Sequence, residues 1–285
     1  MSAGETRSAK RSTERSAEKI PSGVKNEGDL QPAGPALDGF RNLVHKENRE
    51  WLAGWSWLVH GVAWLLLVTG VPLVVGFIRA QGDNSPQNVN EISALLYFVM
   101  GSVATVIAVV AKTQSAIIGE KQMGTAAWVL SKPTSRKAFV LAKLVVHFRW
   151  LLVLTLGVPG VVFYAVIPAF SGLPIPILPF LGGFGVLALG MLFYLALSLL
   201  LGAVFGSRGA VAAIVFGFFV GGVMLSQYAE WMTAAFPWLF WESAYYLVAT
   251  SNEVPAIGVS AIILTAVWCV VLVAGALWSF QRAEV

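Results

Sequence analysis

The segment Ile118–Lys143, IGEKQMGTAAWVLSKPTSRKAFVLAK, is the long polar stretch that divides the apolar part of the chain. It lies between two apolar runs, each of which reaches the roughly 20 residues that a bilayer core requires. Its basic residues are Lys121, Lys132, Arg136, Lys137 and Lys143. Because basic loops between membrane spans stay on the cytoplasmic side, we interpret this segment as a cytoplasmic docking loop.

The composition indicates a membrane protein. Of 285 residues, 57% are hydrophobic and only 12% are charged, whereas a soluble domain has about 25% charged residues. The basic residues lie in loops between apolar runs and form no basic soluble face, so we expect no nucleic-acid partner. The single cysteine, Cys269, lies inside an apolar run, which predicts neither an internal disulfide nor a metal cluster.

Two segments precede the first apolar run. Residues 1–36 are rich in Ser, Lys, Arg, Glu, Pro and Gly, which predicts a disordered cytoplasmic tail. Residues 37–54 place Phe40, Leu43, Val44 and Trp51 on one helical face, which predicts an amphipathic helix in the membrane interface. Glu47 falls inside this apolar stripe, and a carboxylate there requires a partner. Two interpretations are open: Glu47 reaches water or a neighbouring base, or it contacts another cytoplasmic element.

The remainder predicts an all-α polytopic membrane protein with six spans. We expect them at about 55–78, 92–111, 139–169, 180–205, 210–226 and 256–280. With this topology, Arg79 is the one base among the 19 Lys and Arg that lies on the outer side. This bias predicts a multi-pass protein with both termini in the cytoplasm.

The predicted spans carry no Asp, Glu, Lys, Arg or His near their middle. Ion-coupled carriers generally need such groups at mid-membrane, so the pattern argues against that class. We also find no cluster of catalytic side chains, and no GxxxxGK[ST] phosphate loop that would bind ATP. The sequence therefore predicts a chain that is not an enzyme and has no catalytic, metal or cofactor residues of its own.

Small and aromatic residues leave two further questions open. The fourth and fifth spans are rich in glycine, which fits either packing within the chain or a subunit interface. The loop 228–254 combines many aromatic residues with Glu230, Pro237 and Glu242, so it is too polar for a span. It predicts one or two short helices at the outer interface that act as a membrane anchor or as a lid.

The docking loop resembles the signature region of ABC-2 type transporter permeases, the membrane subunits of type-2 ATP-binding-cassette exporters. The matching residues are Glu120, Gly124, Thr125, Leu130-Ser131, Pro133, Ser135-Arg136, Leu141 and Lys143. The segment before the first span is similar to the elbow helix of that family, at Leu43-Val44, Lys46-Glu47, Arg49 and Glu50. With the six-span layout, the resemblance covers the chain from about residue 37 onward.

The resemblance implies a transport subunit driven by another protein. A separate ATP-binding-cassette ATPase subunit, which holds ATP and Mg²⁺, would dock on residues 118–138 and on the elbow helix. The docking residues implied are Glu120, Gly124, Thr125, Leu130, Pro133, Ser135, Arg136 and Lys143, with Lys46, Glu47 and Arg49 from the elbow. A coupling helix is implied between spans two and three, and Thr134 or Ser135 is suited to cap the helix that follows.

One six-span chain is half of such an exporter, so a second copy or a paralogous permease would pair with it in the plasma membrane. The alternative is a membrane anchor or assembly protein that transports nothing.

Overall fold

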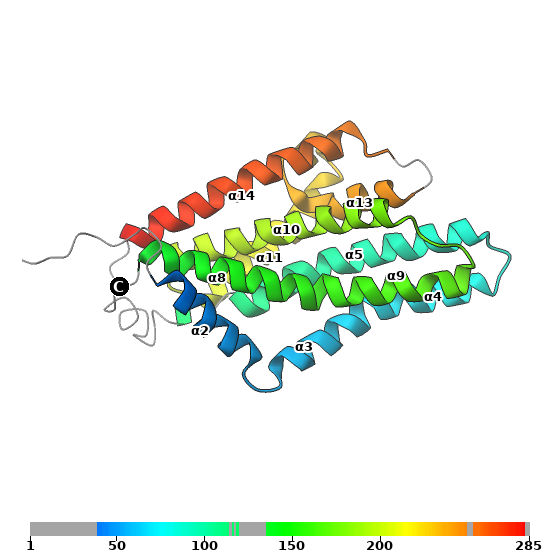
Figure 1. Cartoon of the computed structure of the whole chain (residues 1–285). Coiled ribbons are helices and arrows are strands. Elements are labelled where there is room, and N and C mark those ends of the chain that lie inside the picture. The colour runs from blue at the N-terminus through cyan, green and yellow to red at the C-terminus, as the bar shows by residue number, and fades with distance from the viewer. Residues whose placement is uncertain (1–38, 114–115, 117, 120–134, 250–252, 283–285) are drawn as a thin grey trace, which may run out of the picture. The chain divides into compact units, whose positions relative to one another are not determined.

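The computed structural model describes residues 39–113, 116, 118–119, 135–249 and 253–282, and all of the regular structure in these ranges is helical. Helix α2 (Phe40–Leu52) precedes six helical segments that are long and apolar enough to cross a membrane (Figure 1). The predicted all-α fold with six spans is therefore confirmed.

Four spans are continuous helices: α5 (Pro86–Thr113), α10 (Ile177–Val204), α11 (Arg208–Ser226) and α14 (Ala256–Arg282). Span 1, Ser56–Ala80, consists of α3 (Ser56–Trp64), the π-helix η1 (Leu65–Gly70) and α4 (Val71–Ala80). Span 3, Arg136–Ser171, consists of α8 (Arg136–Leu151), the π-helix η2 (Leu152–Gly157) and α9 (Val158–Ser171). Span 2 begins at Pro86, ahead of the expected start near residue 92.

Spans 1 and 3 share a local sequence and a local conformation. Leu65–Pro72 reads LLLVTGVP and Leu152–Pro159 reads LVLTLGVP, and in each the π-helix occupies the residues before Val-Pro. Proline has no N–H to donate to the preceding turn, and such a break in the ladder favours a wider turn. The two π-helices pack against each other, and Thr69 Oγ1 donates a hydrogen bond of 2.9 Å to the Pro159 carbonyl.

The core between the spans is aromatic and depends on close approach at glycines. Tyr97 of α5 stacks on Phe163 of α9 at 4.9 Å between centroids, and its hydroxyl donates to the Leu156 carbonyl at 3.0 Å. A Cβ at Gly160 would lie 2.6 Å from that hydroxyl, and one at Gly183 would lie 2.6 Å from the Phe98 ring. Glycine at these positions therefore allows neighbouring spans to pack within the chain.

The glycines on α11 fall into two groups. A Cβ at Gly222 would overlap the indole of Trp238, so this glycine serves packing within the chain. At Gly217 and Gly221, no other described part of the chain lies within 4 Å of the position that a Cβ would take. Gly222 therefore fits packing within the chain, and the exposed Gly217 and Gly221 fit the alternative of a subunit interface.

The segment after α11 packs into the bundle as short helices. These are α12 (Glu230–Thr233), the 3-10 turn η3 (Pro237–Leu239) and α13 (Phe240–Val248). Helix α13 packs against α5 and α10, and Trp238 and Phe240 are buried. Tyr228 and Trp231 remain exposed, and their residues are 90% and 75% accessible.

Span 3 is longer than a bilayer core. Its 36 residues cover about 54 Å at about 1.5 Å per residue, against a hydrocarbon core of about 30 Å. Its charged residues, Arg136, Lys137, Lys143 and Arg149, all lie in α8. The first turns of α8 therefore extend beyond the membrane, at the end of the bundle where α2 lies (Figure 1).

Candidate functional site

The predicted docking residues fall partly inside the described structure. Glu120, Gly124, Thr125, Leu130 and Pro133 lie outside the described residues, as does the expected coupling helix. Ser135, Arg136 and Lys143 are described, together with α2 and its residues Lys46, Glu47 and Arg49. The described part of the candidate site is thus the surface on which α2 and α8 meet.

Ser135 fixes where α8 begins. It has an extended backbone, and its Oγ accepts a hydrogen bond of 3.0 Å from the Ala138 N–H. This bond satisfies one of the amides that a helix start leaves without a partner. The helix cap expected at Thr134 or Ser135 is therefore formed by Ser135.

Helix α2 lies along α8 and buries Leu43, Glu47 and Trp51 against it. Glu47 is 3% exposed and Lys143 is 2% exposed, and Lys143 Nζ lies 2.8 Å from Glu47 Oε1. Lys46 Nζ approaches the same oxygen at 3.8 Å. The carboxylate in the apolar stripe thus contacts another element, in addition to its neighbour in sequence. We call this contact surface the α2–α8 seam.

The seam continues into α14. Lys143 Nζ lies 5.0 Å from the centroid of the Phe139 ring, and Phe139 stacks on Phe280 of α14 at 5.1 Å with an angle of 7° between the rings. Arg136 Nη1 donates a hydrogen bond of 2.8 Å to the Gln281 carbonyl. The start of α8 therefore holds the last turn of α14 as well as α2.

Sequence reasoning missed a second group of seam residues nearer the membrane. Asn48 Oδ1 accepts from Arg149 Nη2 at 2.6 Å and from Trp150 Nε1 at 3.2 Å. The ring of Trp51 stacks with that of Trp150, at 6.5 Å between centroids. Helical periodicity had placed Asn48 with Arg41, His45 and Arg49 on the polar face, and of these Arg41, His45 and Arg49 are exposed.

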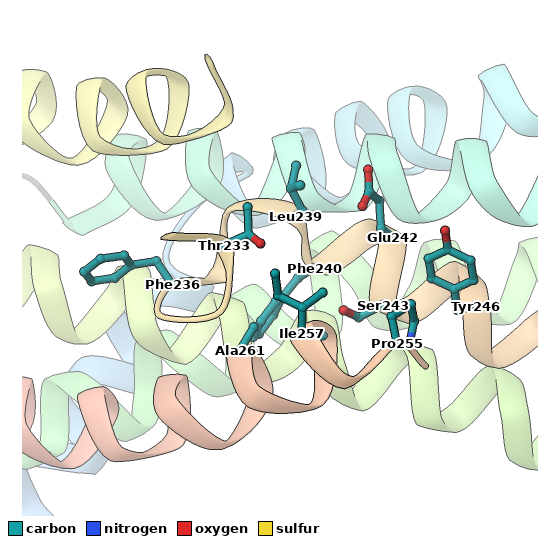
Figure 2. A pocket seen from close by; sticks show the side chains of 11 residues that line it. Thr233, Phe236, Leu239, Phe240, Glu242, Ser243, Tyr246, Pro255, Ile257 and Ala261 are labelled. Atoms are coloured by element: carbon teal, nitrogen blue, oxygen red, sulfur yellow. The ribbon is translucent and has the colours of Figure 1, made fainter. Parts of the chain in front are cut away.

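At the end of the bundle away from α2, a small pocket lies between α12, α13 and the start of α14. Figure 2 shows Glu242 and Tyr246 on α13 near Ser243, with Phe236 and Thr233 across from them. Its volume is about 40 Å³, which leaves room for a few water molecules, since about 10–15 Å³ of cavity volume holds one. Partial burial raises the pKa of the Glu242 carboxyl.

Two larger cavities also lie away from the seam. One, of about 410 Å³, lies between the start of α5, the α9–α10 turn and the end of α13, near Asn90 and Glu91. The other, of about 280 Å³, is an apolar groove between α9 and α10 near Gly160 and Phe180. Among the described residues, no three His, Cys, Asp or Glu side chains gather as metal ligands would.

The seam joins three elements, because α8 contacts both α2 and α14. It brings together buried and hydrogen-bonded contacts at the end of span 3 that carries its charged residues. With the six apolar helices, these features define a polytopic helical membrane protein in which α2 and α14 both pack on α8.

The comparison with protein families agrees with this class. A family model described as ABC-2 family transporter protein matches residues 41–285, so the chain belongs to the ABC-2 transporter family. The membrane components of this family are permease parts of ATP-binding-cassette transporters and are not themselves enzymes. Among curated proteins, none matches the chain closely enough to count as a relative.

Proposed function

We propose that this chain is the permease subunit of an ATP-binding-cassette exporter, which moves a substrate across the plasma membrane with ATP hydrolysed by a separate subunit. Two observations support the proposal: the chain belongs to the ABC-2 transporter family, and its α2 and α8 meet at the α2–α8 seam. The polar segment after α5 leads directly into α8, and the first turns of α8 are held to α2 and α14.

The ATPase subunit, with its ATP and Mg²⁺, docks on residues 118–138 and on α2. The docking residues are Glu120, Gly124, Thr125, Leu130, Pro133, Ser135, Arg136 and Lys143, with Lys46, Glu47 and Arg49 from α2. Lys143 and Glu47 are buried, so they position the surface and do not touch the partner. Arg49 and Lys137 are exposed, so they supply positive charge on the docking surface.

Closure of two ATPase subunits moves the docking segments, and α8 carries this movement into span 3. Because α2 leads into span 1 and α14 is span 6, the seam applies one displacement to three spans. The α2 end is accordingly the cytoplasmic end, and both termini lie on that side.

Two copies of the chain pair through α11. Gly209, Ala213, Gly217 and Gly221 recur at every fourth residue and are exposed, and we call them the α11 stripe. Small residues at this spacing let helices approach closely in a membrane. The open positions at Gly217 and Gly221 support a second copy as the other half of the transporter.

Co-purification of the full chain with an ATP-binding-cassette ATPase subunit tests the docking. We expect Glu120→Lys and Arg136→Glu to reduce the amount of ATPase recovered. Arg208→Glu is the matched control, since Arg208 is exposed at the start of α11, away from the seam. Full recovery with both docking variants would contradict the proposal.

A membrane anchor or assembly protein remains the second candidate, because family membership alone does not require transport by this chain. The two functions differ in the ATPase rate of the reconstituted complex. An exporter changes that rate when its substrate is added, whereas an anchor leaves it the same for every compound tested.

A further inference from the structure

Two cations and two indole rings form a continuous row of contacts where α2, α5 and α8 meet. Lys112 Nζ lies 4.8 Å from the centroid of the Trp51 ring, and Trp51 stacks with Trp150 at 6.5 Å and 18°. Arg149 Cζ lies 5.2 Å from the centroid of the Trp150 ring. We call these four residues the cation–indole column.

The column is fixed by the helices around it. Asn48 Oδ1 accepts from both Arg149 Nη2 and Trp150 Nε1, so it sets the direction of the guanidinium relative to the indole. His147 meets the Trp51 ring edge-on at 5.7 Å. Trp51 is 7% exposed, whereas Arg149 is exposed and Lys112 is partly so. The rings are therefore held in place while both cations stay accessible.

No carboxylate among the described residues neutralises the column. The acids nearest in sequence, Glu47 and Glu50, are engaged by Lys46 and Lys143, and neither Lys112 nor Arg149 forms an ion pair within the described ranges. Arg149 uses one of its five N–H donors on Asn48. Within the described part of the chain, the positive charges of Lys112 and Arg149 therefore have no acidic partner and lie against indole rings.

The position of the column matches the headgroup layer of a membrane. Counting back from Ser171 by about 20 residues, the length that crosses a hydrocarbon core, reaches Leu152. Trp150 and Arg149 follow immediately outside this boundary. Lys112 lies in the last turn of α5 and contacts Trp51, so it belongs to the same layer.

We propose that the cation–indole column is a binding site for the phosphate of anionic membrane lipids. The planar guanidinium of Arg149 pairs with phosphate oxygens through two parallel N–H donors, and Lys112 adds a second positive charge. The partly exposed indole of Trp150 packs beside the glycerol and upper acyl region, where tryptophan is favoured, and the buried Trp51 supports it from behind. The proposal does not rest on docking of the ATPase subunit, because the contacts that carry it lie within this chain.

Native mass spectrometry tests the site by measuring the phosphatidylglycerol that stays bound to the full chain. The chain is released from nanodiscs of phosphatidylcholine that contain about one-fifth phosphatidylglycerol. We expect Arg149→Gln and Lys112→Gln each to lower the retained phosphatidylglycerol by about fivefold. Lys137→Gln is the control, because it removes the same charge from an exposed position on α8 beyond the boundary. An equal loss with Lys137→Gln, or no loss with either column variant, would overturn the proposal.

A second variant guards against loss of folding. Arg149→Lys keeps the charge but not the planar fork, and we expect retention between that of the wild type and Arg149→Gln. Retention equal to the wild type would refute a role for the guanidinium. A final arm adds inorganic phosphate at the concentration of lipid headgroups: displacement of the lipid would show a site for free phosphate and overturn the assignment to lipid.

Discussion

At the scale of single residues, the seam depends on one carboxylate and one ammonium that are both almost fully enclosed. Glu47 and Lys143 are each less than 5% exposed and lie 2.8 Å apart. Two buried charges are tolerated because their mutual attraction offsets the cost of removing both from water. Removal of one leaves the other buried without a counter-charge. The pair therefore fixes the register of α2 on α8 more than it adds net stability.

Single substitutions in this pair should cost more than the double one. We expect Glu47→Gln or Lys143→Met to lower the free energy of unfolding by about 3–5 kcal/mol, and Glu47→Leu with Lys143→Met to cost less than either. Unfolding in mixed micelles measures the difference. Glu50→Gln, which removes an exposed carboxylate, is the control and should change stability by less than about 1 kcal/mol. Equal costs for single and double variants would argue against the pair.

Two adjacent glycines on α11 give a second test at this scale. Gly222→Ala places a methyl group into the Trp238 indole, and overpacking of this kind costs about 1–3 kcal/mol. Within one copy Gly221→Ala meets open space among the described residues, so for the monomeric fraction in detergent we expect a change within about 0.5 kcal/mol. The thermal midpoints of the two variants in detergent should therefore differ. If they match, Trp238 does not rest on Gly222.

At the scale of elements, spans 1 and 3 are joined at two levels. The α2–α8 seam joins them at one end, and the paired π-helices η1 and η2 join them within the membrane through Thr69 and Pro159. A π-helix before proline is a local weakness in an otherwise regular ladder. We expect spans 1 and 3 to bend at these two π-helices, between the end where α2 and α8 meet and the halves α4 and α9.

The hydroxyl of Thr69 should contribute measurably to this junction. We expect Thr69→Val to lower the free energy of unfolding by about 0.6–1.7 kcal/mol, and Thr69→Ser to restore most of it. Thr265→Val is the matched control, because the buried Thr265 hydroxyl has no hydrogen-bond partner among the residues that the structure describes. A larger cost at Thr265 than at Thr69 would contradict the role of the Thr69–Pro159 bond.

The elements differ in how far the sequence predicts them. Hydropathy and turn residues predict the six spans, because each span is a local property of its own residues. The side-chain partners of Glu47 and Asn48 depend on the register between helices about a hundred residues apart, which no local pattern contains. The repeated motif Leu-x-Leu-x-x-Gly-Val-Pro coincides with both π-helices, so the sequence does contain a local signal for them. Proline within a span, however, is usually taken to indicate a kink and not a π-helix.

At the scale of the whole molecule, the α11 stripe is the surface through which the proposed pair would form. In a Cys269→Ala background, we expect Gly217→Cys to form a disulfide between two copies in the membrane, because stripe positions of paired helices face each other. Val270→Cys on α14 is the control, since it is 70% exposed on another span. Non-reducing gels measure the product. Equal cross-linking at both positions would indicate random collision.

The seam also sets an order of events during synthesis. Glu47 and Lys143 are 96 residues apart in the chain, so at about 5–20 residues per second the carboxylate leaves the ribosome roughly 5–20 s before this partner exists. During that interval α2 cannot pack on α8, because α8 has not been synthesised, while spans 1 and 2 enter the bilayer. A chain truncated before residue 143 lacks Lys143 and cannot form the seam. We therefore expect α2 of such a chain to stay unpacked and to be open to proteolysis.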